Sequence, residues 1–292
     1  MLMSLIGKYS ARIRAIEERC RRMQEALGRI EARQLSGLKP DQIHAAEFAV
    51  FSQWGEDGIV QHLLRHVPIS NKVFVEFGVE NYMEANTRFL LFKDNWAGLV
   101  MDGSRQNIDY IRRDPISWRF NLKAEQAFIT RENINDLIRR NGISGEIGVL
   151  SIDIDGNDYW VWEAIDVITP AVVIVEYNHR FGPDRVVTIP YRADFQRTKA
   201  HYSNIYYGAS LAAICRLGKT KGYAFVGCTT AGNDAFFVRR DLKPDSIPEL
   251  TPAAGFVHGK FRESRDEKGK LSFLDEAQEA AILARLPVVE IS

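Results

Sequence analysis

The chain has 292 residues, which is enough for one large α/β domain with appendages or for two small domains. Its 38 basic and 38 acidic residues give a formal net charge of zero, so no overall positive field would attract nucleic acid. Three cysteines are too few and too scattered for a disulfide framework or a zinc cluster, and no apolar run approaches the length of a membrane span. We therefore expect a cytoplasmic protein without a nucleic-acid partner or a membrane span.

The first 34 residues carry a heptad repeat. Apolar residues recur at alternating spacings of three and four, and Arg12 at a g position would face Glu17 at the following e position of a parallel neighbour. We expect residues 1–34 to form a coiled coil that makes the protein a homo-oligomer, although Gly28 and Cys20 argue against this interpretation. The apolar positions are Ile6, Tyr9, Ile13, Ile16, Cys20, Met23, Leu27 and Ile30.

Two other interpretations of this helix stay open. It could be a single amphipathic helix that packs on its own domain. It could also make peripheral contact with an anionic membrane surface, because eight basic and four acidic residues fall between Lys8 and Arg33.

A linker at 35–40 leads into alternating helical and strand-like segments, which we assign to one domain at 41–245. The alternation predicts a Rossmann-like, doubly wound α/β sheet that is mostly parallel and ends in an antiparallel hairpin. Residues 246–292 are predicted to form a C-terminal extension with a helix at 274–286. Strands are predicted at 73–77, 97–101, 128–129, 147–154, 171–176, 224–227 and 235–239, and helices at 41–67 with a break, 85–93, 105–113, 132–140, 159–165 and 209–217.

A cluster of carboxylates, Asp153, Asp155 and Asp158, follows the buried strand predicted at 147–154. In an open α/β sheet, ligands bind outside the carboxyl ends of the strands. Asp155 or Asn157 could simply cap the next helix, as Asp and Asn often do. Three aspartates within six residues exceed what one cap needs, so the pattern predicts a functional site here.

The first two predicted strands also end in residues suited to a ligand. Gly78 follows the first strand, and a glycine at such a turn lets the backbone approach a ligand closely. Asp102 ends the second strand 24 residues later, where an acidic residue can bind the hydroxyls of a ribose. Capping of the following helix is an equally simple explanation for Asp102 alone.

Together with Val175-Glu176-Tyr177-Asn178, these strand ends resemble the FkbM-like branch of the class I S-adenosylmethionine-dependent methyltransferases, over about residues 51–239. The resemblance implies O-methylation of a sugar hydroxyl, in a surface glycan or its activated precursor. It also implies that S-adenosylmethionine is held by Glu76, Gly78, Glu80, Asp102, Ser104, Thr130 and Asp153.

Methylation of a hydroxyl needs a base or a metal ion, because the hydroxyl must lose its proton as it attacks the methyl group. Asp153, Asp155 and His179 are the candidate catalytic residues. Asp153, Asp155 and Glu176 would lie at the ends of neighbouring strands, where their hard oxygen ligands would suit Mg²⁺ or Mn²⁺. His179 could instead be a surface residue and Glu176 a structural one.

Aromatic side chains near these strand ends could stack on a sugar ring, and Trp160, Tyr206 and Tyr207 are the candidates. Ordinary core packing is the alternative. Gln53, Glu56 and Asp57 precede the first strand and could close over the cofactor or cap a helix.

Two other functions also fit the pattern. The domain could be a non-catalytic scaffold, since its first turn has a single glycine where the family usually has more, or it could bind a nucleotide sugar on the same sheet.

Overall fold

The computed structural model describes residues 2–292, without the side chains of residues 1–11 and 14. A seven-stranded sheet in the order β3-β2-β1-β4-β5-β8-β7 forms its centre. Strands β1 to β5 are parallel, and β8 runs opposite to both of its neighbours. This is the topology of a class I methyltransferase, so the predicted fold class is confirmed. The strands are β1 (Val73–Phe77), β2 (Ala97–Asp102), β3 (Leu122–Gln126), β4 (Gly145–Ile152), β5 (Ile168–Glu176), β7 (Tyr223–Cys228) and β8 (Asp234–Arg239).

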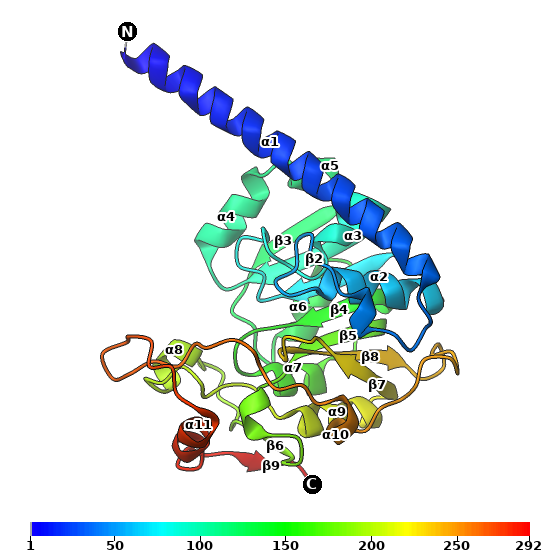
Figure 1. The fold of residues 1–292 in the computed structure, drawn as a ribbon, viewed down its shortest axis with the longest axis vertical. Coiled ribbons are helices and arrows are strands. Elements are labelled where there is room, and N and C mark those ends of the chain that lie inside the picture. Colours follow the sequence, from blue (N-terminus) through cyan, green and yellow to red (C-terminus); the bar gives the residue numbers. More distant parts are fainter. Residues whose placement is uncertain (1) are drawn as a thin grey trace.

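Helices cover both faces of the sheet because side chains alternate along each buried strand (Figure 1). Phe74 of β1 packs toward α2, α3 and α4, and its neighbour Val75 packs toward α6, α7 and α9. The apolar core therefore lies in two layers on either side of the sheet. The covering helices are α2 (Glu56–His66), α3 (Arg88–Asp94), α4 (Arg105–Arg113), α6 (Ile134–Arg140), α7 (Asp158–Ala164) and α9 (Leu211–Thr220).

Two predicted strands differ from the structure. The strand predicted at 128–129 is wrong, because β3 lies at Leu122–Gln126 and Phe128 and Ile129 follow it. This edge strand is half-exposed and mostly polar, so it lacks the apolar signal of a buried strand. The strand predicted at 147–154 ends at Ile152, because Asp155 adopts a positive φ of 54° in the turn that follows.

Among the described side chains of the N-terminal helix α1 (Leu2–Gln34), those of its C-terminal part pack on the domain, and the N-terminal part of the helix projects away (Figure 1). Glu25, Gly28 and Ala32 face the domain. The seam predicted from the heptad repeat lies on another side of the helix and is exposed from Ile13 to Ile30. Ile6 and Tyr9 belong to the residues whose side chains are not described.

The C-terminal region crosses the carboxyl end of the sheet and does not form a separate layer. The predicted linker begins with the turn η1 (Leu35–Gly37), whose Leu35 is buried, and α11 (Glu276–Leu283) contributes Leu283 to a third, smaller cluster with Tyr206 and Tyr207. No helix within residues 2–292 is both long enough and apolar enough to span a membrane. The remaining elements are η2 (His44–Ala46), α5 (Ile116–Arg119), η3 (His179–Phe181), β6 (Val187–Thr188), α8 (Arg197–Ala200), α10 (Pro252–Gly255) and β9 (Val289–Glu290).

Candidate functional site

A cleft lies at the carboxyl ends of β1 and β4, the point where the strand order reverses and where open α/β sheets bind ligands. It consists of two hollows of about 380 Å³ and about 200 Å³, which share Gly78, Glu80, Asp153 and Asp155. The larger hollow is lined by Gln53, Trp54, Glu56, Glu76, Phe77, Gly78, Val79, Glu80, Asn81, Glu84, Ala85, Asn86, Asp153, Asp155, Glu176, Arg197, Asn233, Asp234, Phe261 and Glu263. The smaller is lined by Gly78, Glu80, Asp102, Gly103, Ala127, Phe128, Ile129, Asp153, Ile154, Asp155, Asn157 and Phe195.

Gly78 lets the turns after β1 and β4 come together. Its φ is 81°, and a Cβ atom here would lie only 1.4 Å from the carbonyl oxygen of Asp153. Any other residue would therefore meet both backbone strain and a backbone clash. One glycine is enough to bring the two loops into contact at the floor of the cleft.

Asp102 ties the turn after β1 to the start of α4. Its Oδ2 accepts a hydrogen bond from the backbone N–H of Glu80 at 2.9 Å, and its Oδ1 accepts from the backbone N–H of Ser104 at 2.7 Å. Each carboxylate oxygen has a second lone pair, so Asp102 keeps acceptor capacity toward the smaller hollow. Its position at the end of β2 fits a ligand with vicinal hydroxyls.

Glu76 is buried beneath the loop that enters α3. Its Oε1 accepts from the backbone N–H of Asn86 at 2.8 Å, and its Oε2 accepts from the backbone N–H of Thr87 at 3.1 Å. Desolvation raises the pKa of Glu76 to about 7, although these donors oppose the shift. Glu76 therefore organises the wall of the larger hollow as well as lining it.

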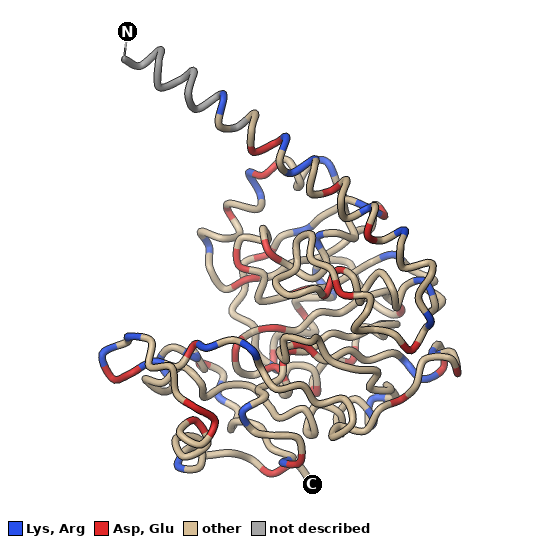
Figure 2. Tube along the Cα trace, viewed as in Figure 1, with Lys and Arg blue, Asp and Glu red and all other residues tan. Residues whose placement is uncertain are grey.

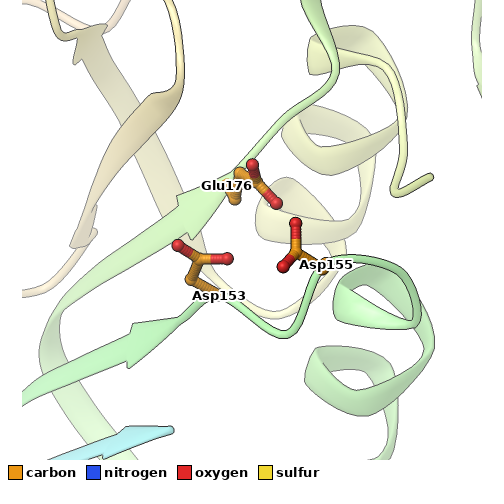
Figure 3. Close-up of side chains that lie close together, drawn as sticks. All are labelled: Asp153, Asp155 and Glu176. Carbon is orange, nitrogen blue, oxygen red and sulfur yellow. The ribbon is translucent and has the colours of Figure 1, made fainter. Parts of the chain in front are cut away.

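Asp153, Asp155 and Glu176 form a carboxylate triad on the floor of the cleft, and we keep this name for them. Their side chains converge from β5 and from the turn after β4 (Figure 3), with an oxygen of each within 4.8 Å of the others. Glu176 is only 8% exposed, and its Oε2 has no hydrogen-bond partner among the described residues. A buried carboxylate oxygen without a donor is costly, so the triad fits a bound cation.

Burial and mutual repulsion make Glu176 and Asp153 hold protons more tightly than free carboxylates do. Desolvation, and then the negative charge of Asp153, raises the pKa of Glu176 well above the ordinary range. Desolvation and the charge of Asp155 act in the same direction on Asp153, where water in the open cleft screens part of the effect. Asp234, directly opposite Glu176 on β8, is also buried, and desolvation raises its pKa.

Among the described residues that line the larger hollow, Arg197 is the one basic residue against nine acidic ones. Its guanidinium pairs with Asp155 and Glu263 and lies 3.7 Å from the centre of the Tyr207 ring. Arg197 therefore neutralises the charge of Asp155. Among the described residues, Asp153 and Glu176 form no salt bridge. Such a cleft favours a cationic ligand, whether a metal ion, an ammonium group or a sulfonium group.

Asp158 fixes the shape of the turn that carries Asp155. Its Oδ1 accepts from the backbone N–H of Ile154 at 2.8 Å, and its Oδ2 accepts from the backbone N–H of Gly156 at 2.9 Å. The residue before α7 is Asn157, whose side chain makes no capping hydrogen bond, so the predicted cap by Asp155 or Asn157 is wrong. Asp153 and Asp155 face the cleft instead.

Several residues predicted to serve the site do not line the cleft. Ser104 caps α4 and Thr130 bonds to Asn133 beside α6. His179 is 2% exposed beneath the segment around His258, and desolvation lowers its pKa to about 2. The aromatic candidates are packed internally: the Trp160 indole N–H donates to Ile189, the Tyr206 hydroxyl donates to Pro287, and Tyr207 is buried under Arg197.

The structure adds cleft residues that the sequence did not single out. Trp54 and Phe261 stack at the larger hollow with ring centres 6.1 Å apart, and Arg197 and Glu263 pair beside them. The polar sequence around Gln53 was a usable signal, because Gln53 and Glu56 do line the cleft. Nothing local marks the other residues, which come from distant loops.

No known protein family and no curated protein matches the sequence. Among solved structures, the N-terminal domain of EvdMO1 with SAH bound is 11% identical at a TM-score of 0.42, over 74% of this chain and 95% of that one. A putative caffeoyl-CoA O-methyltransferase from Staphylococcus aureus is 14% identical at 0.39, over 63% and 82%. An S-adenosylmethionine-dependent methyltransferase from Clostridium acetobutylicum ATCC 824 is 9% identical at 0.39, over 63% and 89%. Likenesses this distant assign no function.

Proposed function

We propose that the protein transfers a methyl group from S-adenosylmethionine to a hydroxyl group, with a divalent cation bound by the carboxylate triad. The observation that carries the proposal is the unpaired, buried carboxylate of Glu176 beside Asp153, next to the tight turn at Gly78. The cleft places a nucleoside-sized hollow and an acidic hollow side by side at the switch point of the sheet.

S-adenosylmethionine suits these two hollows. Its adenosine would occupy the smaller one, with the ribose hydroxyls on Asp102 and the base beside Phe128 and Ile129. Its ammonium and sulfonium groups are positive, and they would lie in the larger hollow near Glu80.

Mg²⁺ or Mn²⁺ fits the triad because the donors are hard carboxylate oxygens that already converge. When bound, such an ion would lower the pKa of an acceptor hydroxyl that coordinates it. Asp153, Asp155 and Glu176 would hold the ion. Asp155 also pairs with Arg197. Without the ion, the raised pKa of Asp153 suits it to accept the proton of the acceptor hydroxyl.

The acceptor would enter over Trp54 and Phe261. The resemblance in the sequence points to a sugar, and an apolar sugar face stacks well on exposed aromatic rings. We predict that Trp54→Ala raises the KM for the acceptor about tenfold and leaves the Kd for S-adenosylmethionine unchanged, as steady-state kinetics and calorimetry would measure. Trp118→Ala, at an exposed site outside the cleft, is the matched control. Equal effects of both substitutions would contradict this acceptor site.

Transfer of a labelled methyl group tests the proposed reaction. Protein, Mg²⁺ and methyl-labelled S-adenosylmethionine are incubated with a panel of glycans and nucleotide sugars, and base-stable label in the acceptor is counted. Asp153→Asn should lower turnover at least about a hundredfold and keep the affinity for the methyl donor, because it removes a proton acceptor and a cation ligand. Asp166→Asn, an exposed substitution, should have no effect.

Three outcomes would contradict the proposal. Label that appears only in amines would exclude hydroxyl transfer. A protein that binds a nucleotide sugar and no methyl donor would favour the nucleotide-sugar alternative, and one that binds neither would favour a scaffold.

A further inference from the structure

The helix α1 carries an apolar stripe that its own domain leaves uncovered. Ile13, Ile16, Met23, Leu27 and Ile30 are 55%, 59%, 59%, 61% and 46% exposed, and Cys20 between them is exposed as well. These residues occupy successive a and d positions, so they form one continuous seam along the helix. We call them the α1 seam.

The domain binds α1 through the opposite side, at b and f positions of the same heptads. Glu25, Gly28 and Ala32 are buried there, and a Cβ atom on Gly28 would lie 2.4 Å from Cγ2 of Val50. Close approach of helix and domain thus accounts for Gly28, which does not interrupt the helix. The packed side and the seam are different faces, so docking on the domain leaves the seam available.

Between residues 12 and 20 of α1, every described side chain except that of Glu18 is exposed, so this part of the helix has little support from the domain. A helix of 33 residues is about 50 Å long, and its N-terminal part extends away from the domain (Figure 1). Helices in water draw most of their stability from packing of an apolar face. A projecting helix with an uncovered seam therefore needs a partner.

Charges beside the seam identify a second copy of this chain in parallel orientation. Acidic residues (Glu17 and Glu31) take e positions and basic residues (Arg12 and Arg19) take g positions, and none of the four is paired with another described side chain. In a parallel pair, g faces e of the neighbour, which places Arg12 against Glu17. An antiparallel pair would instead place like charges together. Figure 2 shows the alternation of charge along α1.

We propose that two copies associate through the α1 seam as a parallel, in-register coiled coil. The two domains then lie on the outer sides of the coil, each held by its own Gly28 contact. The proposal does not depend on the chemistry of the cleft.

Mass measurement by light scattering tests the association. The full chain should elute as a dimer, and Ile16→Glu should elute as a monomer, because it buries a carboxylate pair at a d position. The neighbouring Ala15→Glu adds the same charge at an exposed c position and should remain a dimer. A monomeric wild type, or a wild type that is monomeric and sediments with phosphatidylserine vesicles, would overturn the proposal.

Disulfide trapping tests the orientation. Ile13→Cys in a Cys20→Ser background should give a covalent dimer on treatment with a thiol oxidant, because equal residues meet in a parallel pair. The Cys20→Ser parent should not, since Cys228 is buried and Cys215 half-buried. A dimer that does not cross-link at Ile13→Cys would overturn the parallel register.

Discussion

The carboxylate of Glu176 lies on the floor of the cleft, and its Oε2 accepts no hydrogen bond from the described residues. We predict that Mg²⁺ at pH 8 raises the free energy of unfolding of the wild type, by about 2.7 kcal/mol when its concentration is a hundred times Kd. Glu176→Gln should abolish this increase and should itself unfold less readily in a chelator, because it removes a buried anion. Urea unfolding with and without Mg²⁺ measures both effects.

The matched control is Glu163→Gln, which removes an exposed carboxylate from α7. It should respond to Mg²⁺ as the wild type does. A wild-type unfolding curve that Mg²⁺ leaves in place would contradict a cation site at the triad.

Glu76 predicts how stability depends on pH. Its pKa is about 7 in the folded protein against an ordinary 4.5, because desolvation outweighs its three hydrogen bonds. The folded state therefore binds more protons than the unfolded state between these values, and stability falls as pH rises through the window. Relative to Glu76→Gln, the wild type should lose roughly 3 kcal/mol between pH 4 and pH 8. Urea unfolding of both proteins across this range measures the effect. A constant difference between their free energies of unfolding would contradict the raised pKa of Glu76.

The residues of the triad could be predicted from the sequence because each lies at or just after the end of a strand. Asp153 and Asp155 lie in the turn that follows β4, and Glu176 is the last residue of β5. Pairing of β4 with β5 therefore brings them together. Arg197 and Glu263 could not be predicted in this way. They reach the cleft through long loops whose path depends on packing and leaves no periodic signal.

At the scale of elements, the turn after β1 depends on Gly78. We predict that Gly78→Ala lowers the free energy of unfolding by roughly 3 kcal/mol or more and abolishes binding of S-adenosylmethionine, because the new Cβ clashes with the carbonyl of Asp153. Gly222→Ala is the matched control, since Gly222 has a φ of 86° and nothing within 4 Å of the added Cβ. It should cost only the strain, about 1 kcal/mol, and leave binding intact. Equal losses in both variants would contradict the contact.

Buried elements could be predicted closely and exposed ones could not. The predictions for β1 and α4 match the structure at both ends, because one is an apolar run and the other a short helix with a serine cap. The position of β3 was predicted wrongly because this edge strand is half-exposed and mostly polar, so it lacks the apolar run of a buried strand. The heptad repeat of α1 predicted a helix, and its b and f positions, which showed no apolar pattern, turned out to bind the domain.

At the scale of the whole molecule, Arg180 connects the C-terminal region to the cleft. It is almost fully buried and pairs with Glu279 at 2.9 Å and Glu263 at 3.3 Å. We predict that Arg180→Ala lowers the free energy of unfolding by about 3 kcal/mol, because it strands two partly buried carboxylates. Proteolysis between 260 and 270 should also quicken. Arg185→Ala, at an exposed site nearby, should change neither, and a protease-resistant Arg180→Ala would contradict this role.

The predicted C-terminal extension contributes to the cleft. Phe261 and Glu263 from it line the same hollow as Gly78 and Glu176. Contacts across 80 residues, such as the hydrogen bond from the Tyr177 hydroxyl to the Val257 carbonyl, are set by tertiary packing. Composition alone gives no indication of them.

Calorimetric titration with S-adenosylmethionine, once with Mg²⁺ and once with a chelator, tests whether the cleft binds a methyl donor. We expect saturable binding at micromolar Kd that S-adenosylhomocysteine displaces, with a larger heat and a higher affinity in the presence of Mg²⁺. Asp102→Ala should weaken this binding about tenfold through loss of the ribose contact. Absence of binding in both conditions would contradict the assignment of the cleft to a methyl donor.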